Sequence, residues 1–269
     1  MPVLTLFGLL VAVLANMTGI EGGTLFVPLL TLLFGLSPQE AAGVSMATMV
    51  FGLGAGSLAY AHQRRIDSRL ALALLAVSLP GTVVGAWLSQ YLPARALQLL
   101  LGLILIPLGF RMILRRESLK MEPVQEVSVG WQRVWVDRSG TEFRYAIHHL
   151  PLGLLTYSLI GLIAGLLGIG GGAIMLPTLV LLLGLPPHVA IATSVFVMAC
   201  TALAGGLTHG AVGQVSLNYV VYLVPGVLVG SQAGVRLARR VPAALLMKLL
   251  GWLVALTGLV IIAKSLTGA

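Results

Sequence analysis

Apolar side chains fill long stretches of this chain, and polar side chains gather between them. Five apolar runs come first, at about 3–15, 24–34, 41–61, 70–88 and 96–114. After a polar segment, five more follow at about 152–167, 173–183, 189–208, 217–237 and 243–263. Because a hydrocarbon core of about 30 Å needs about 20 apolar residues per helical crossing, the longer runs predict membrane-spanning helices.

The composition excludes a water-soluble globule. Apolar residues make up 58% of the chain and charged residues 9%, against about 25% charged in an ordinary soluble domain. The net charge of +8 would suit nucleic acid, but the basic residues lie in short loops between apolar runs, so we expect the lipid bilayer and no nucleic acid as partner. The single cysteine, Cys200, forms no Cys-x-x-Cys pair, and we expect neither a metal nor a cofactor.

The two sets of runs are internal repeats. With a gapless shift of 149 residues, residues 20–28 align with 169–177 and residues 35–38 with 184–187, and the register brings Ser45 onto Ser194. This alignment divides the chain into a first transmembrane repeat at 1–114, a polar segment at 115–150 and a second transmembrane repeat at 151–269.

The first segment of each half must be interrupted. Residues 3–34 would form a continuous helix of about 48 Å, which is too long for one crossing and too short for two. Glycine-rich stretches lie near the middle, at 19–23 and 168–172, where glycine permits irregular backbone. We therefore predict an all-α integral membrane protein of two inverted repeats, each a glycine-broken helical hairpin followed by three transmembrane helices.

The charges test this topology. If the broken segments return to the face on which they start, the halves are inverted and the loops 62–69, 111–149 and 236–240 share one face. These loops carry 13 of the 16 basic residues. The positive-inside rule then places them in the cytoplasm and both termini outside, in a multi-pass protein of the cytoplasmic membrane. Parallel halves would instead place the basic cluster at 236–240 outside.

The polar segment contains a predicted β-hairpin. Strand-like sequences at 131–136 and 141–145 flank a glycine-containing turn at 137–140. An isolated hairpin is only marginally stable in water. We expect it either to pack on the membrane domain or to pair with a second copy of the chain, which would make a homodimer.

The two breaks are the candidate binding site. Helix N-termini attract anions through free backbone N–H groups and the positive end of the helix dipole. Residues 22–24 open one half-helix and residues 171–173 the other, so two positive ends could face one small anion. The candidate substrate-binding residues are Asn16, Gly19, Glu21, Gly22, Gly23, Thr24, Ser45, Thr48, Gly168, Gly170, Gly171, Gly172, Ala173, Thr193 and Ser194.

These motifs resemble those of the TauE/SafE sulfite exporter family. The resemblance rests on the glycine cluster 168–172 followed by 175–177, its degenerate copy in the first half, the repeated Pro-Gly with a later Gly, and the segment 238–242. It implies transport of small sulfur oxyanions or organosulfonates such as sulfite, sulfoacetate or taurine-derived products. The departure is Glu21, where the second half and the family pattern have glycine.

Several candidates have an alternative interpretation. Glu21 is either a functional carboxyl, and then the candidate for proton coupling, or a protonated group bonded to loose backbone. The hydroxyls at 45, 48, 193 and 194 either contact the ligand or bond a helix. We expect His62 and His209 to lie at the membrane interface.

Two rival functions remain. A passive anion channel would share the anion-attracting helix ends. An intramembrane enzyme would need a ligand set such as His-Glu-x-x-His, which the sequence lacks, and Ser194 with His209 makes a poor catalytic pair. The prediction is a transporter, not an enzyme, that exports a small sulfur-containing anion by alternating access.

Overall fold

The computed structural model describes residues 2–18, 22–114, 131–136, 142–237 and 243–267. The first half contains α1 (Pro2–Thr18), α2 (Gly23–Leu33), α3 (Pro38–His62), α4 (Ser68–Leu88), the short 3₁₀ helix η1 (Ser89–Tyr91) and α5 (Ala94–Leu114). Two strands follow, β1 (Trp131–Val136) and β2 (Glu142–Ile147). The second half contains α6 (Leu150–Leu167), α7 (Gly172–Pro177), the π-helical turn η2 (Thr178–Leu182), α8 (Pro187–Ala211), α9 (Leu217–Leu237) and α10 (Ala243–Thr267).

Five helices within the described residues are long and apolar enough to cross a membrane. They are Pro38–His62, Ser68–Tyr91, Ala94–Arg111, Leu150–Leu167 and Val189–Ala211. Large apolar side chains on the outside of these helices, such as Leu72, Leu103 and Leu207, are about two-thirds exposed. Since such exposure is costly in water, the outer surface suits lipid. The chain is an all-α membrane protein, as the sequence predicts.

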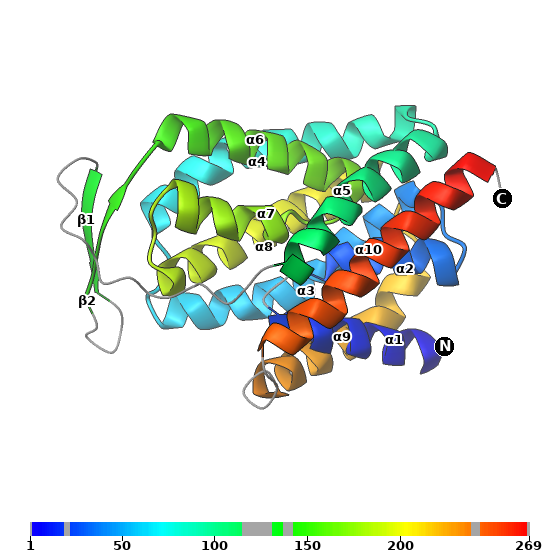
Figure 1. The fold of residues 1–269 in the computed structure, drawn as a ribbon, viewed down its shortest axis with the longest axis horizontal. Helices are drawn as coiled ribbons and strands as arrows, with labels where there is room; N and C mark the ends of the chain where they lie inside the picture. Colours follow the sequence, from blue (N-terminus) through cyan, green and yellow to red (C-terminus); the bar gives the residue numbers. More distant parts are fainter. Residues whose placement is uncertain (1, 19–21, 115–130, 137–141, 238–242, 268–269) are drawn as a thin grey trace.

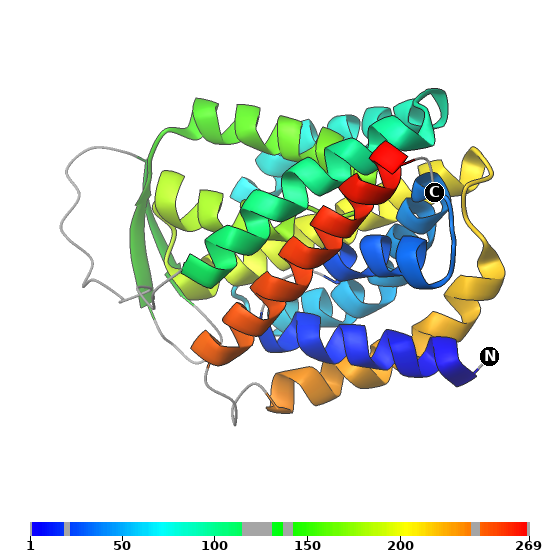
Figure 2. The ribbon, with the colours of Figure 1, turned by 45° about the vertical axis from the view of Figure 1, so that its right-hand side comes forward.

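Helices of one half pack pairwise against helices of the other half. In Figures 1 and 2, α1 lies along α9, α6 along α4 and α10 along α5, while α3 packs on α8. Glycines allow this close approach. A Cβ atom on Gly81 would lie 2.6 Å from the carbonyl oxygen of Ser158, and a Cβ on Gly230 would meet the carbonyl oxygen of Leu9. The two contacts involve residues that the 149-residue shift relates, so the α4–α6 and α9–α1 pairs repeat one packing arrangement.

The β-hairpin and the chain termini mark opposite ends of the helix bundle (Figure 1). Strands β1 and β2 pair antiparallel, with Trp131 opposite Ile147. The Tyr145 hydroxyl donates to Asp67 Oδ2 at 2.7 Å, beside the start of α4. The hairpin therefore packs on the helix bundle at this end.

Each broken segment begins and ends on the same end of the bundle. The rings of Phe7 in α1 and Phe34 after α2 lie 5.2 Å apart, near the chain termini. In the second half, the His148 amide just before α6 donates to the Leu183 carbonyl just after η2, at the hairpin end. Both segments are thus helical hairpins, while the division into units at 1–114, 115–150 and 151–269 stays a prediction.

Candidate functional site

The second helix of each hairpin reaches only about half-way through a membrane. Helix α2 has 11 residues, and α7 with η2 spans residues 172–182. At 1.5 Å per residue each is about 16 Å long, roughly half of a 30 Å hydrocarbon core. In a helix of this length that ends at the membrane surface, the first residue, Gly23 or Gly172, would lie near mid-depth.

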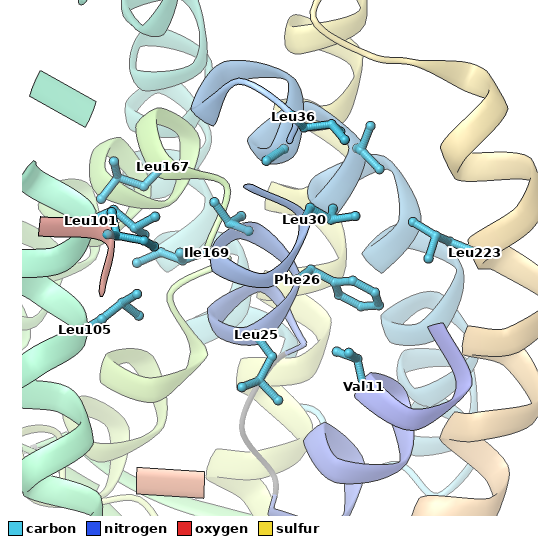
Figure 3. Packing of buried hydrophobic residues seen from close by; sticks show 14 of the residues in the cluster. Val11, Leu25, Phe26, Leu30, Leu36, Leu101, Leu105, Leu167, Ile169 and Leu223 are labelled. Atoms are coloured by element: carbon cyan, nitrogen blue, oxygen red, sulfur yellow. The ribbon is translucent and has the colours of Figure 1, made fainter. Parts of the chain in front are cut away.

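The two breaks meet in the interior of the bundle. A Cβ atom on Gly23 would lie 2.8 Å from the carbonyl carbon and oxygen of Ile169, and 2.9 Å from the Gly168 carbonyl oxygen. Figure 3 shows Leu25, Phe26 and Ile169 in one apolar cluster around this contact. Only glycine lets the start of α2 approach the second break so closely.

Glycine also sets the backbone of the second break. Gly168, Gly170 and Gly171 have φ angles of 68°, 75° and 85°, in the left-handed region that disfavours residues with a Cβ atom. The Gly168 amide donates to the Ala164 carbonyl and ends α6, while the Gly171 carbonyl accepts from the amides of residues 174 and 175 and opens α7. Gly172 and Ala173 are the first two residues of α7.

Helix α3 holds the second break from the side. Gly168 packs directly against Ala42, and the Ser45 hydroxyl donates to the Gly168 carbonyl at 2.9 Å. Thr48 follows three residues later, on the same face of the helix. It is fully buried, and its Oγ1 has no hydrogen-bond partner among the described residues.

The other candidate binding residues lie in different surroundings. Gly22 precedes α2, and its carbonyl accepts from the amides of residues 25 and 26, while Thr24 is buried in the first turn. Thr193 Oγ1 accepts a hydrogen bond from the Asp67 amide at 3.1 Å, and the Ser194 hydroxyl donates to the Ile191 carbonyl of its own helix at 3.0 Å. Asn16 lies in the last turn of α1. Gly19 and Glu21 lie outside the described residues.

The expectation for His209 is wrong. This side chain is fully buried, with Nε2 2.8 Å from the Gly165 carbonyl and Nδ1 2.6 Å from Gln214 Oε1. The loop after α8 folds back and places Gln214 over the ring, so a residue at the end of a span is enclosed. His62 at the end of α3 is exposed.

Asp67 is a buried polar residue that the sequence analysis missed. Its Oδ1 accepts the Leu70 amide at 3.1 Å and caps α4, and its Oδ2 accepts from Tyr145. An aspartate directly before an apolar run is an N-cap signal, which identifies the cap but not the burial. No group of three His, Cys, Asp or Glu side chains suited to a metal occurs among the described residues.

Comparison with known proteins decides the family. The family model described as Sulfite exporter TauE/SafE matches residues 4–261. The chain belongs to this family. It is 29% identical over 245 residues to the Probable membrane transporter protein YunE of Bacillus subtilis, which covers 88% of each chain. It is 22% identical over 256 residues to the Probable membrane transporter protein MJ0441 of Methanocaldococcus jannaschii, which covers 90% of this chain and 87% of the relative.

A plant relative matches a shorter stretch. The Sulfite exporter TauE/SafE family protein 3 of Arabidopsis thaliana is 36% identical over 85 residues, which is 32% of this chain and 18% of that protein. No solved structure matches the chain significantly. The family and the fold together make this a multi-pass membrane transporter of the TauE/SafE type, a class of proteins that are not enzymes.

Proposed function

We propose that this transporter carries small sulfur-containing anions, such as sulfite, sulfoacetate or related organosulfonates, across the cytoplasmic membrane by alternating access. The observation that carries the proposal is the meeting of the two breaks, where Gly23 lies against Gly168 and Ile169. Thr48, whose buried hydroxyl has no partner in the described part of the chain, lies one helical turn from Ser45, which bonds the Gly168 carbonyl. The family name supports the class of substrate.

The chemistry of this region suits an oxyanion. The start of α2 contributes the positive end of an 11-residue helix, and backbone N–H groups there can donate to an anionic oxygen. The Thr48 hydroxyl, one helical turn from Ser45, is a further donor without a partner among the described residues, and such a buried hydroxyl is costly until a ligand accepts from it. We propose the remaining candidates, Gly170 to Ala173 included, as the backbone wall of this site.

The repeated architecture supports alternating access. We propose that the two halves are inverted repeats. Each half contributes a helical hairpin that returns to the end of the bundle where it starts, followed by three helices that each cross from one end of the bundle to the other. In the present conformation the breaks are in contact, so an anion must separate them to bind. Two related conformations, in which either half opens the site, would expose it to each side of the membrane in turn.

The charges support export. The hairpin end of the bundle holds the loop after α3 and the start of α4, with Arg64, Arg65 and Arg69, and the positive-inside rule makes this end cytoplasmic. With a cytoplasm-negative potential, outward movement of a monoanion is favoured by about 2.3 kcal/mol per 100 mV. Export then needs no coupled ion, whereas uptake against this potential would need a coupled cation, and Glu21 is the candidate for coupling that uptake to protons.

Reconstitution in proteoliposomes tests the function. Proteoliposomes that contain the purified protein are loaded in turn with sulfite, sulfate, thiosulfate, sulfoacetate and taurine. Efflux of each compound is then measured under an imposed membrane potential. The proposal predicts saturable efflux of at least one sulfur-containing anion and counterflow, in which unlabelled anion on one side drives uptake of labelled anion from the other. Flux without saturation or counterflow would indicate a channel, and no flux of any of the five would contradict the substrate class.

A further inference from the structure

His209 of α8 occupies an unusual place for a titratable side chain at a helix end. It is fully buried, and both ring nitrogens have partners on other segments. Nε2 lies 2.8 Å from the Gly165 carbonyl of α6, and Nδ1 lies 2.6 Å from the side chain of Gln214. The ring therefore connects the end of α8 to the last turn of α6.

The Gly165 carbonyl belongs to the part of α6 that loses its helical partners. In a continuous helix this carbonyl would accept the amide of residue 169. Gly168 has a φ angle of 68° and turns the chain away, and the last amide bond onto α6 is the one from Gly168 to Ala164. The His209 ring takes the position that the missing amide would have had.

The hydrogen-bond partners fix which nitrogen carries a proton. A carbonyl oxygen can only accept, so Nε2 must donate to Gly165. In a neutral ring Nδ1 is then an acceptor, so the Gln214 amide must be turned end for end, with its NH₂ group in place of the Oε1 that lies 2.6 Å from Nδ1. With the amide turned in this way, its NH₂ group has a second hydrogen for Ser89 Oγ, which lies 2.9 Å from the same atom of Gln214 and donates its own single hydrogen to the Ala86 carbonyl at 2.7 Å. Gln214 and Ser89 thus orient the ring with every group paired.

Side chains from two different helices donate to carbonyls at or next to the second break. Ser45 of α3 donates to the carbonyl of Gly168, and His209 of α8 donates to the carbonyl of Gly165. We propose that His209 is a positioning residue for transport, which fixes the end of α6 and with it the backbone of the second break. This role rests on the proposed function, in which that backbone forms part of the anion site.

Amide hydrogen exchange of the purified protein tests the positioning without any substrate. His209→Leu removes the donor and keeps an apolar side chain, whereas His209→Gln keeps an amide N–H that can reach the same carbonyl. We expect His209→Leu to raise exchange at residues 165–172 about tenfold, equivalent to ~1.4 kcal/mol, and His209→Gln to stay near wild type. His62→Leu, at the exposed end of α3, is the matched control and should change nothing at 165–172.

Transport supplies the second measurement. In proteoliposomes, His209→Leu should raise KM for the transported anion about tenfold, and His209→Gln should restore it.

Wild-type exchange at 165–172 in His209→Leu would overturn the proposal, as would an equal rise over all helices, which would indicate a role in overall stability. If His209→Leu does not fold, Gln214→Met, which removes the partner of Nδ1, should show the same local rise, and its absence would overturn the proposal. Local loosening with an unchanged KM would also overturn it. If none of the five compounds is transported, the proposed function fails while the exchange result still decides the positioning.

Discussion

The hydroxyl of Ser45 donates to the backbone carbonyl of Gly168 over 2.9 Å and joins helix α3 of one half to the break of the other. Both residues are buried. The contact links positions 123 residues apart in sequence. It makes the second break a part of the interface between the halves.

Loss of this bond should destabilise the protein. Ser45→Ala leaves the Gly168 carbonyl buried without the Ser45 donor, which costs about 1–3 kcal/mol. Ser194 is the related residue in the second half, but its hydroxyl bonds its own helix at Ile191, so Ser194→Ala should cost less than about 1 kcal/mol. Thermal unfolding of both variants in the same detergent measures the difference. Equal losses of stability would contradict the inequivalence of the two serines.

The contact between the breaks predicts a specific requirement for glycine at position 23. The Cβ of Gly23→Ala would lie 2.8 Å from the Ile169 carbonyl, so the breaks must shift, and transport in proteoliposomes should fall at least about tenfold. Gly54 of α3 has no atoms within 4 Å of the corresponding Cβ position. Gly54→Ala is therefore the control, and it should transport normally with a stability gain of about 0.5–1 kcal/mol. Normal transport by Gly23→Ala would remove this contact from the site.

A side-chain bond joins strand β2 to the N-cap of α4 and helps to hold the β-hairpin on the helix bundle. Tyr145→Phe removes the donor to Asp67 while it keeps the buried ring, and we expect a loss of about 1–3 kcal/mol because the acceptor is a carboxylate. Amide exchange at residues 142–147 should rise accordingly. Tyr91→Phe, at a side chain that is 65% exposed, should change neither quantity. Unchanged exchange at 142–147 would show that other contacts hold the hairpin.

A pair of exposed glutamines tests the membrane orientation. Gln63 follows α3 at the hairpin end, and Gln90 lies in η1 at the opposite end. In a Cys200→Ser background, Gln63→Cys should react with an impermeant maleimide only from the cytoplasm, and Gln90→Cys only from outside. Labelling of Gln63→Cys from outside would reverse the orientation.

The sequence predicts the helices and the breaks because both depend on local chemistry. Runs of apolar residues determine the membrane-spanning helices, and the glycines between 168 and 172 predict irregular backbone whatever residues surround them. The different partners of Ser45 and Ser194 could not be predicted, since the internal alignment makes them equivalent and only tertiary packing distinguishes them.

The buried polar residues show a second limit. His209 lies at the end of an apolar run, where an interfacial position is the natural prediction, and its enclosure depends on how the following loop folds over it. Asp67 is readable as an N-cap, but its burial depends on the docking of a hairpin 78 residues away in sequence. Contacts between distant segments leave no periodic pattern in the sequence.

The proposed function requires that a small anion binds between the breaks and accepts a hydrogen bond from Thr48. Thr48→Val replaces a buried, unpaired hydroxyl by a methyl group, so it should stabilise the free protein by about 1 kcal/mol and weaken anion binding about tenfold. Ser78 has the other buried hydroxyl without a partner among the described residues, and Ser78→Ala should stabilise the protein without changing the affinity. Calorimetric titration of both variants and wild type with the transported anion is the most direct measurement. We expect a higher Kd for Thr48→Val alone, and a wild-type Kd in Thr48→Val would show that the anion does not bind at Thr48.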